Sequence, residues 1–120
     1  MAYHFADRVC CIVGLRGSLL RNEPKTASAL TRAILEAHDW TVGKPQDAAA
    51  SFAKFAPKNV TAEGIVGMLQ GQTHNHRPVG SELKKELALY AGELRSIQVF
   101  KQSTDPVQFA EKVYADVFSV

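Results

Sequence analysis

The chain has 120 residues, of which 46% are hydrophobic and 22% are charged, and its net charge is +2 at pH 7. This size and balance are typical of a single globular domain, expected to span residues 1–120, and they exclude a disordered chain and a membrane-spanning apolar segment. Because charges of both signs alternate along the sequence, no strong field is expected to attract nucleic acid or anionic lipid.

The first predicted element is a strand over residues 9–13. Its apolar residues form a continuous run that ends at Gly14, which is typical of a strand buried on both faces. Cys10 and Cys11 would point to opposite faces of this strand, so we expect buried, reduced thiols and no disulfide. No later run has comparable strand character, so the neighbouring strands are expected outside the chain. An uncovered strand edge can pair with another chain, which predicts a homo-oligomer formed through this strand.

A turn over residues 14–18 and then two helices are predicted next. The first helix begins at Pro24 and ends near Trp40, because apolar residues recur every three or four positions on one face (Ala27, Leu30, Ile34 and Ala37). The second is short and stops before Pro57. Its aromatic residues, Phe52 and Phe55, are expected in the core.

Three further helices follow in the second half of the chain. Thr61 is predicted to cap the third helix, where Gly64 and Gly67 indicate close packing against another helix. Ser81 is predicted to cap the fourth and longest helix, which carries an apolar stripe (Leu83, Leu87, Tyr90, Ala91, Leu94 and Ile97). Asp105 and Pro106 begin the last helix, with apolar positions at helical spacing (Val107, Ala110, Val113, Tyr114 and Val117).

A set of residues in the first three helices matches the pattern of a known protein family. The matching residues are Glu23, Pro24, Ala29, Leu30, Ala33, Glu36, Ala37, Trp40, Asp47, Ala48, Ala49, Val60 and Ile65. With the order of elements over nearly the whole chain, they resemble the solute-binding proteins of ABC importers in the nitrate, sulfonate, taurine and bicarbonate group. The resemblance implies a mainly α fold with one N-terminal β-strand, which is a partial α/β lobe of a type II periplasmic-binding-protein-like fold.

The same resemblance implies a function in binding rather than catalysis. The chain would be the C-terminal lobe fragment of a two-lobed protein that closes around a small oxyanion or sulfonate, such as nitrate, bicarbonate or taurine. Its partners would be that anionic solute and the membrane subunits of the ABC transporter, with no cofactor and no nucleic acid. The family is periplasmic, but residues 1–20 lack the pattern of an export signal, so the chain as written is expected in the cytoplasm.

Arg8 is the best candidate for a ligand contact. It precedes the predicted strand, at the position that the resemblance places near the cleft, and a guanidinium can hold a planar oxyanion through two parallel hydrogen bonds. His4 and Cys10 are weaker candidates at the same rim.

Other chemistries find less support in the sequence. Gly14 to Ser18 matches neither standard phosphate-binding motif, and His74 and His76 lack further ligands at zinc spacing, so no metal site is expected. No nucleophile motif surrounds Ser18, so we expect no enzyme activity. Two alternatives stay open: a helix-turn-helix-like DNA-binding protein over residues 47–94, whose central helix carries no basic residue, and a small helical protein-interaction module.

Overall fold

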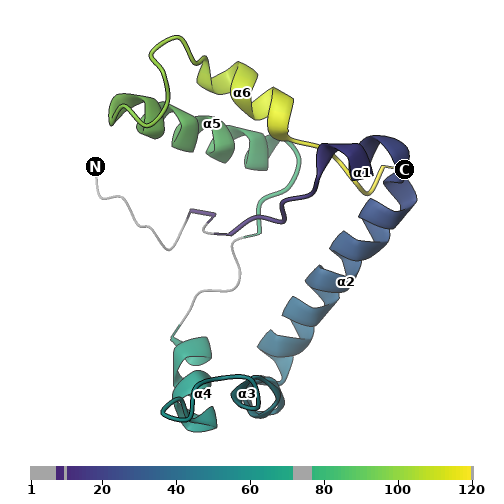
Figure 1. Cartoon of the computed structure of the whole chain (residues 1–120), viewed down its shortest axis with the longest axis vertical. Helices are drawn as coiled ribbons and strands as arrows, with labels where there is room; N and C mark the ends of the chain where they lie inside the picture. The colour runs from purple at the N-terminus through teal and green to yellow at the C-terminus, as the bar shows by residue number, and fades with distance from the viewer. Residues whose placement is uncertain (1–7, 10, 72–76, 120) are drawn as a thin grey trace. The chain divides into compact units, whose positions relative to one another are not determined.

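The computed structural model describes residues 8, 9, 11–71 and 77–119, and this part of the chain contains helices and no strand (Figure 1). The helices are α1 (Gly17–Asn22), α2 (Pro24–Gly43), α3 (Pro45–Ala53), α4 (Ala62–Gln70), α5 (Ser81–Ser96) and α6 (Pro106–Val113). The mainly α character is therefore confirmed. The finer expectation of a lobe of the type II periplasmic-binding-protein-like fold stays a prediction.

The chain divides into two compact units. Unit 1 combines the start of the chain, up to Ile12, with the part that contains α5 and α6. Unit 2 begins at Val13 and contains α1 to α4. The expectation that residues 1–120 form a single domain stays a prediction.

The strand predicted over residues 9–13 is wrong for the residues that the structure describes there. Val9 and residues 11–13 have no strand pairing, and residue 10 lies outside the described part of the chain. Ile12 is 60% exposed and Cys11 is exposed too, so the expected burial on both faces is absent at these positions. The reason is that the main chain of Val9 bonds to side chains of α5 instead of a neighbouring strand. The homo-oligomer expected through this strand stays a prediction.

In unit 2, α1 and α2 follow each other with a single residue between them. The turn expected over residues 14–18 is wrong at its end, because α1 already begins at Gly17. Pro24 begins α2 as predicted, at a position where the missing N–H of proline costs no hydrogen bond. Ala27 and Thr31 are the buried residues of α2, whereas Leu30 is 46% exposed, so much of the predicted apolar face is uncovered within the described structure.

The buried residues of α3 and α4, two helices that contact each other, are small apart from one isoleucine. They are Ala48, Ala49 and Ile65. Phe52 and Phe55 are 61% and 87% exposed, so their predicted place in the core is wrong. Phe52 lies in the last turn of α3 and Phe55 lies beyond its end, whereas the buried alanines, Ala48 and Ala49, lie nearer its start.

The start of α4 follows the sequence prediction, but its glycines do not. Thr61 Oγ1 accepts a hydrogen bond from the Gly64 N–H at 3.1 Å, which confirms the cap. A Cβ added at Gly67 would meet nothing within 4 Å, and one added at Gly64 would meet the Thr61 side chain at 3.3 Å. The close helix packing expected at these glycines is therefore wrong.

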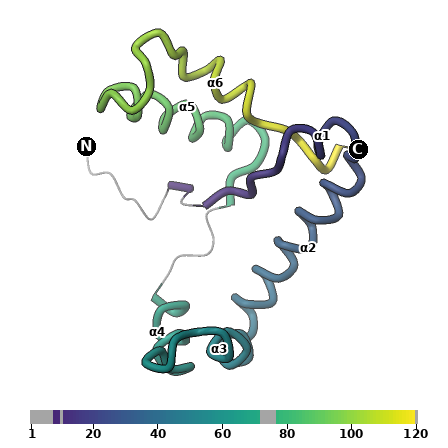
Figure 2. The backbone as a smooth tube through the Cα atoms, in the orientation of Figure 1, coloured from purple at the N-terminus to yellow at the C-terminus, as the bar shows by residue number. Residues whose placement is uncertain are grey.

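Unit 1 is built on an antiparallel hairpin of α5 and α6, which Figure 2 shows as a continuous tube. Ala91 and Ala110 are almost fully buried where the two helices meet, so small side chains let the backbones approach. The rings of Phe100 and Phe109 pack at 5.0 Å between centroids and link the connecting segment to α6. Asp105 caps α6 as predicted, accepting a hydrogen bond from the Gln108 N–H at 2.9 Å.

Two boundaries in unit 1 differ from the prediction. Gly80, not Ser81, is the N-cap of α5, and its φ of 59° is a conformation that glycine adopts without strain. The last helix ends at Val113, so Tyr114 and Val117 lie outside it. Tyr114 turns back instead, because its hydroxyl accepts a hydrogen bond from the Gly80 N–H at 3.1 Å.

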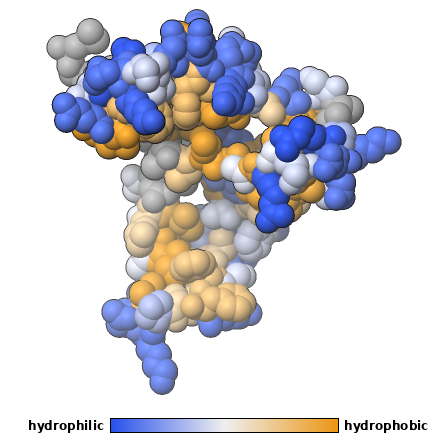
Figure 3. Space-filling view, turned by 45° about the horizontal axis from the view of Figure 1, so that its top comes forward, coloured by the Kyte–Doolittle hydropathy of each residue, from blue (hydrophilic) through white to orange (hydrophobic). Residues whose placement is uncertain are grey.

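Large apolar side chains remain exposed on both units. Figure 3 shows apolar surface gathered over the α3 and α4 part of unit 2, where Phe52, Phe55 and Met68 are exposed. Among the helices of the described segments, none has both the length and the apolar character needed to cross a membrane.

Candidate functional site

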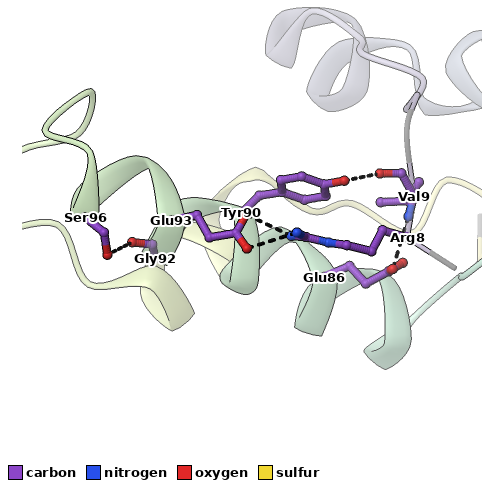
Figure 4. A network of polar contacts seen from close by, with 7 residues as sticks. All are labelled: Arg8, Val9, Glu86, Tyr90, Gly92, Glu93 and Ser96. Carbon is purple, nitrogen blue, oxygen red and sulfur yellow. Dashed lines mark hydrogen bonds and ion pairs between the residues drawn. The ribbon is translucent and has the colours of Figure 1, made fainter. Parts of the chain in front are cut away.

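The most developed polar site of the described residues lies in unit 1, where Arg8 and Val9 meet one face of α5 (Figure 4). Three side chains of α5 form it: Glu86, Tyr90 and Glu93, which we call the α5 clamp. Their spacing of four and then three residues places them on the same side of the helix. The clamp therefore holds a segment that is remote in the sequence.

Arg8 makes the charged contact of the site. Its Nη1 lies 2.9 Å from Glu93 Oε1, and its Nη2 lies 3.0 Å from Glu93 Oε2. This is the two-pronged pairing of a planar guanidinium with a carboxylate, which is stronger and more directional than a single hydrogen bond. The Arg8 side chain is 8% exposed and that of Glu93 is 44% exposed, so solvent reaches the pair from the side of the glutamate.

Tyr90 contacts both residues of the segment at once. The Arg8 guanidinium carbon lies 4.1 Å from the centroid of the Tyr90 ring, within the range of a cation–π interaction. The Tyr90 hydroxyl donates a hydrogen bond to the Val9 carbonyl oxygen at 2.7 Å. One side chain thus supports the arginine with its ring and the neighbouring main chain with its hydroxyl.

Glu86 completes the site on the other side of Val9. Its Oε1 accepts a hydrogen bond from the Val9 N–H at 3.1 Å. Both main-chain groups of Val9 are therefore satisfied by side chains of α5, in place of the partner strand that an extended segment would otherwise need. The three side chains of α5 thus contact the main chain of Val9 and the guanidinium of Arg8, the residue before it.

The predicted site residues have different outcomes in the structure. Arg8 is placed in a two-pronged contact with a carboxylate, but that carboxylate belongs to Glu93 of the same chain. Its role in holding a solute stays a prediction. His4 and Cys10 lie outside the described residues, so the structure does not place them.

Sequence reasoning missed the three residues of the α5 clamp. The sequence pattern places Tyr90 in the apolar stripe and predicts no role for the two glutamates. Their spacing on a helix was a readable signal, but Arg8 and Glu93 are 85 positions apart, and nothing local joins them.

A second polar cluster braces α5 against α6. Lys84 Nζ lies 3.2 Å from Glu111 Oε2 and 5.2 Å from the centroid of the Tyr114 ring. With the hydrogen bond from the Gly80 N–H to the Tyr114 hydroxyl, these contacts tie the start of α5 to the end of α6. The cluster supports the helix that carries the clamp.

The carboxyl group of Asp116 has a shifted pKa. The Ser119 hydroxyl donates a hydrogen bond to its carboxylate, and this bond, followed by one from the Phe118 N–H, lowers the pKa of Asp116 below its ordinary value. All three residues belong to one exposed turn after α6. The shift therefore reports a local turn and indicates no reactive group.

Other regions offer less for ligand binding. Within the described segments, no group of three or more His, Cys, Asp or Glu residues could hold a metal ion, and His74 and His76 lie outside those segments. An open depression of about 300 Å³ lies on α2, lined by Lys25, Ser28, Ala29, Arg32, Ala33 and Glu36. All these residues belong to one helix, so they cannot enclose a small solute.

Comparison of the chain with protein-family models, with curated proteins and with solved structures gave no significant match. The resemblance to ABC-importer solute-binding proteins therefore stays a prediction.

Proposed function

We propose that this protein is a small helical protein-interaction module whose α5 clamp binds an extended segment of polypeptide. In the structure the clamp is occupied by Arg8 and Val9 of the same chain. The single observation that carries the proposal is the capture of both main-chain groups of Val9 by side chains of a distant helix.

Main-chain capture is a common means of peptide recognition. A binding site that satisfies the N–H and C=O of an extended segment provides affinity for any backbone, and a neighbouring side-chain contact provides specificity. The α5 clamp has both parts, because Glu86 and Tyr90 bond to the main chain and Glu93 pairs with the arginine. The exposed side of Glu93 leaves the charged end of the clamp accessible to a competing segment.

The occupant in the same chain acts as a competitor. A tethered segment has an effective concentration on the order of millimolar, so a free peptide must exceed it to displace Arg8 and Val9. Substitution of Arg8 by alanine removes the charged contact of the resident segment but leaves all three clamp residues in place.

The test measures peptide binding by fluorescence anisotropy. The probe is a labelled peptide of residues 5–12 with serine in place of both cysteines, and the proteins are the unmodified chain and its Arg8→Ala variant. We expect saturable binding to Arg8→Ala that is about tenfold or more tighter than to the unmodified chain, because the resident segment competes less well.

A matched control carries Glu93→Gln in addition to Arg8→Ala. This double variant keeps the shape of the side chain and the main-chain contacts but loses the charged partner, so weaker binding is expected. The proposal would be rejected if no variant with native helix content, measured by circular dichroism, binds the peptide saturably.

A second candidate is the solute-binding fragment that the resemblance implies. The observation that favours it is Arg8, whose guanidinium already holds a carboxylate with two hydrogen bonds. Titration calorimetry of the chain with nitrate, bicarbonate, taurine and an alkanesulfonate tests it directly. This candidate requires saturable heat that is lost in Arg8→Ala, and the absence of heat with all four solutes rejects it for this chain.

A further inference from the structure

We infer that the partner of the α5 clamp is a second copy of this chain, which inserts its own Arg8 and Val9 in exchange for the resident pair. This inference rests on the proposed function and names the partner of the same site. Three features of the site favour a second copy: the sequence separation between the segment and α5, the chemistry of arginine, and the main-chain contacts of Val9.

The segment and its receiving site lie far apart in the chain. The contacts from Val9 and Arg8 to α5 join residues that are 77, 81 and 85 positions apart. A pair of elements that is separated in this way can make identical contacts within one chain or between two copies. Residues 11–15 lie between the segment and Arg16, the N-cap of α1, and form neither helix nor strand, so a change of direction within them would break no helical hydrogen bond.

Arginine is the residue that the clamp selects. The contact combines two parallel hydrogen bonds to Glu93 with stacking on the Tyr90 ring. A lysine ammonium is a compact charge that cannot present a planar fork to the carboxylate and a flat face to the ring at the same time. A partner segment must therefore bring an arginine, and the segment at Arg8 is one that demonstrably fits.

The residue after the arginine is recognised through its backbone. Both hydrogen bonds to Val9 involve its N–H and C=O and do not depend on its side chain. A segment with Val9→Ala should therefore bind to the clamp as tightly as the unmodified segment. A segment with Val9→Pro should bind more weakly, because proline lacks the N–H that donates a hydrogen bond to Glu86. The two substitutions separate main-chain recognition from a contact of the valine side chain.

Charge reversal makes the exchange measurable. In Arg8→Glu, the introduced carboxylate faces Glu93 of its own chain, and in Glu93→Arg the introduced guanidinium faces Arg8, so the resident contact is repulsive in both variants. When the two variants are mixed, each segment can meet an oppositely charged clamp in the other chain. Like charges thus disfavour the contact within a chain, and opposite charges favour it between chains.

The experiment measures mass by light scattering for each variant alone and for their equimolar mixture, well below the millimolar effective concentration of a tethered segment. We expect the mass of one chain for each variant alone and the mass of two chains for the mixture. The matched control carries Arg8→Glu and Glu93→Arg in one chain, which restores an opposite pair internally and should keep the mass of one chain. Circular dichroism shows whether each variant retains its helices.

A milder pair keeps the test valid if charge reversal unfolds the hairpin. Arg8→Ala retains the clamp without its arginine, and Glu93→Ala retains the arginine without its carboxylate, so their mixture can form one native contact between chains. Exchange is overturned if both mixtures keep the mass of one chain while the labelled peptide still binds Arg8→Ala. That result leaves the proposed function standing, whereas a peptide that binds no variant rejects the proposed function itself.

The arginine requirement is tested with the same labelled peptide. Replacing its arginine by lysine should weaken binding to Arg8→Ala about tenfold, because the two-pronged contact is lost while the positive charge remains. Equal affinity of the two peptides would overturn the selection of arginine.

Discussion

At the scale of single residues, Gln98 has the most informative backbone. Its φ is 64°, and among the described residues other than glycine it is the one with a positive φ. It follows Ile97, the C-cap of α5, and the N–H groups of Val99 and Phe100 both donate to the Leu94 carbonyl. Glycine is the usual residue at such a left-handed helix end, because a Cβ there costs roughly 1 kcal/mol.

Gln98→Gly should therefore stabilise unit 1. We expect the free energy of unfolding to rise by about 0.5 kcal/mol, since relief of the left-handed strain is partly offset by the larger entropy of glycine in the unfolded chain. Amide hydrogen exchange of α5 and α6 measures the change. The control Gln98→Ala keeps the strained Cβ and should bring no gain, and a gain of equal size in that variant would contradict this explanation.

At the scale of elements, local signals determined where several helices begin. Thr61 and Asp105 were predicted as caps and both accept a hydrogen bond from the N–H three residues later. Ser81 was predicted by the same rule and was wrong, because Gly80 takes the cap position and its N–H is held by Tyr114 from beyond the next helix. A capping rule cannot include a partner that is 34 positions away.

Asp105→Ala should destabilise α6 by about 1 kcal/mol, because the Gln108 N–H loses its acceptor. Hydrogen exchange of the α6 amides measures the loss. Asp105→Asn keeps an oxygen acceptor at the same position and should lose much less. If asparagine and alanine prove equally damaging, the negative charge at the start of the helix, rather than the hydrogen bond, accounts for the effect of Asp105.

At the scale of the whole molecule, the buried apolar residues are unusually small. Among the residues that the structure describes, the buried apolar set consists of Ala27, Ala48, Ala49, Ile65, Ala91 and Ala110, while large side chains such as Phe55 and Met68 are exposed. Exposed apolar surface of this kind is typical of proteins that associate with other chains. The exposure of large apolar side chains, with mostly alanines buried, thus agrees with the proposed interaction module.

Unit 2 allows a direct test of which apolar residues form its core. Ile65→Ala should lower the free energy of unfolding by about 2 kcal/mol or more, because Ile65 is 8% exposed and its removal leaves a cavity between α3 and α4. Phe55→Ser should change it by less than about 0.5 kcal/mol, because this side chain is 87% exposed. Urea unfolding followed by Trp40 fluorescence measures both. A larger loss for Phe55→Ser would restore the predicted core position of this residue.

Of the residues in the candidate site, the sequence predicts a role for Arg8 alone, as a contact for an anionic solute, and that role stays a prediction. The structure places the Arg8 guanidinium against the planar carboxylate of Glu93 in the same chain. Its partners were not identified, because an amphipathic pattern classifies Tyr90 as apolar and leaves two glutamates as solvated charges. The role of these residues depends on a contact across most of the chain.

The sequence by itself determined the helical class and the starts of α2, α4 and α6, because prolines and capping side chains act on neighbouring backbone groups. Only the tertiary structure decided that Val9 and residues 11–13 form no strand, that Phe52 and Phe55 are exposed, and that Arg8 pairs with α5. Each of these outcomes depends on which distant residues compete for the same main-chain groups and surfaces. Local pattern cannot encode that competition, because it is settled by contacts between residues far apart in the chain.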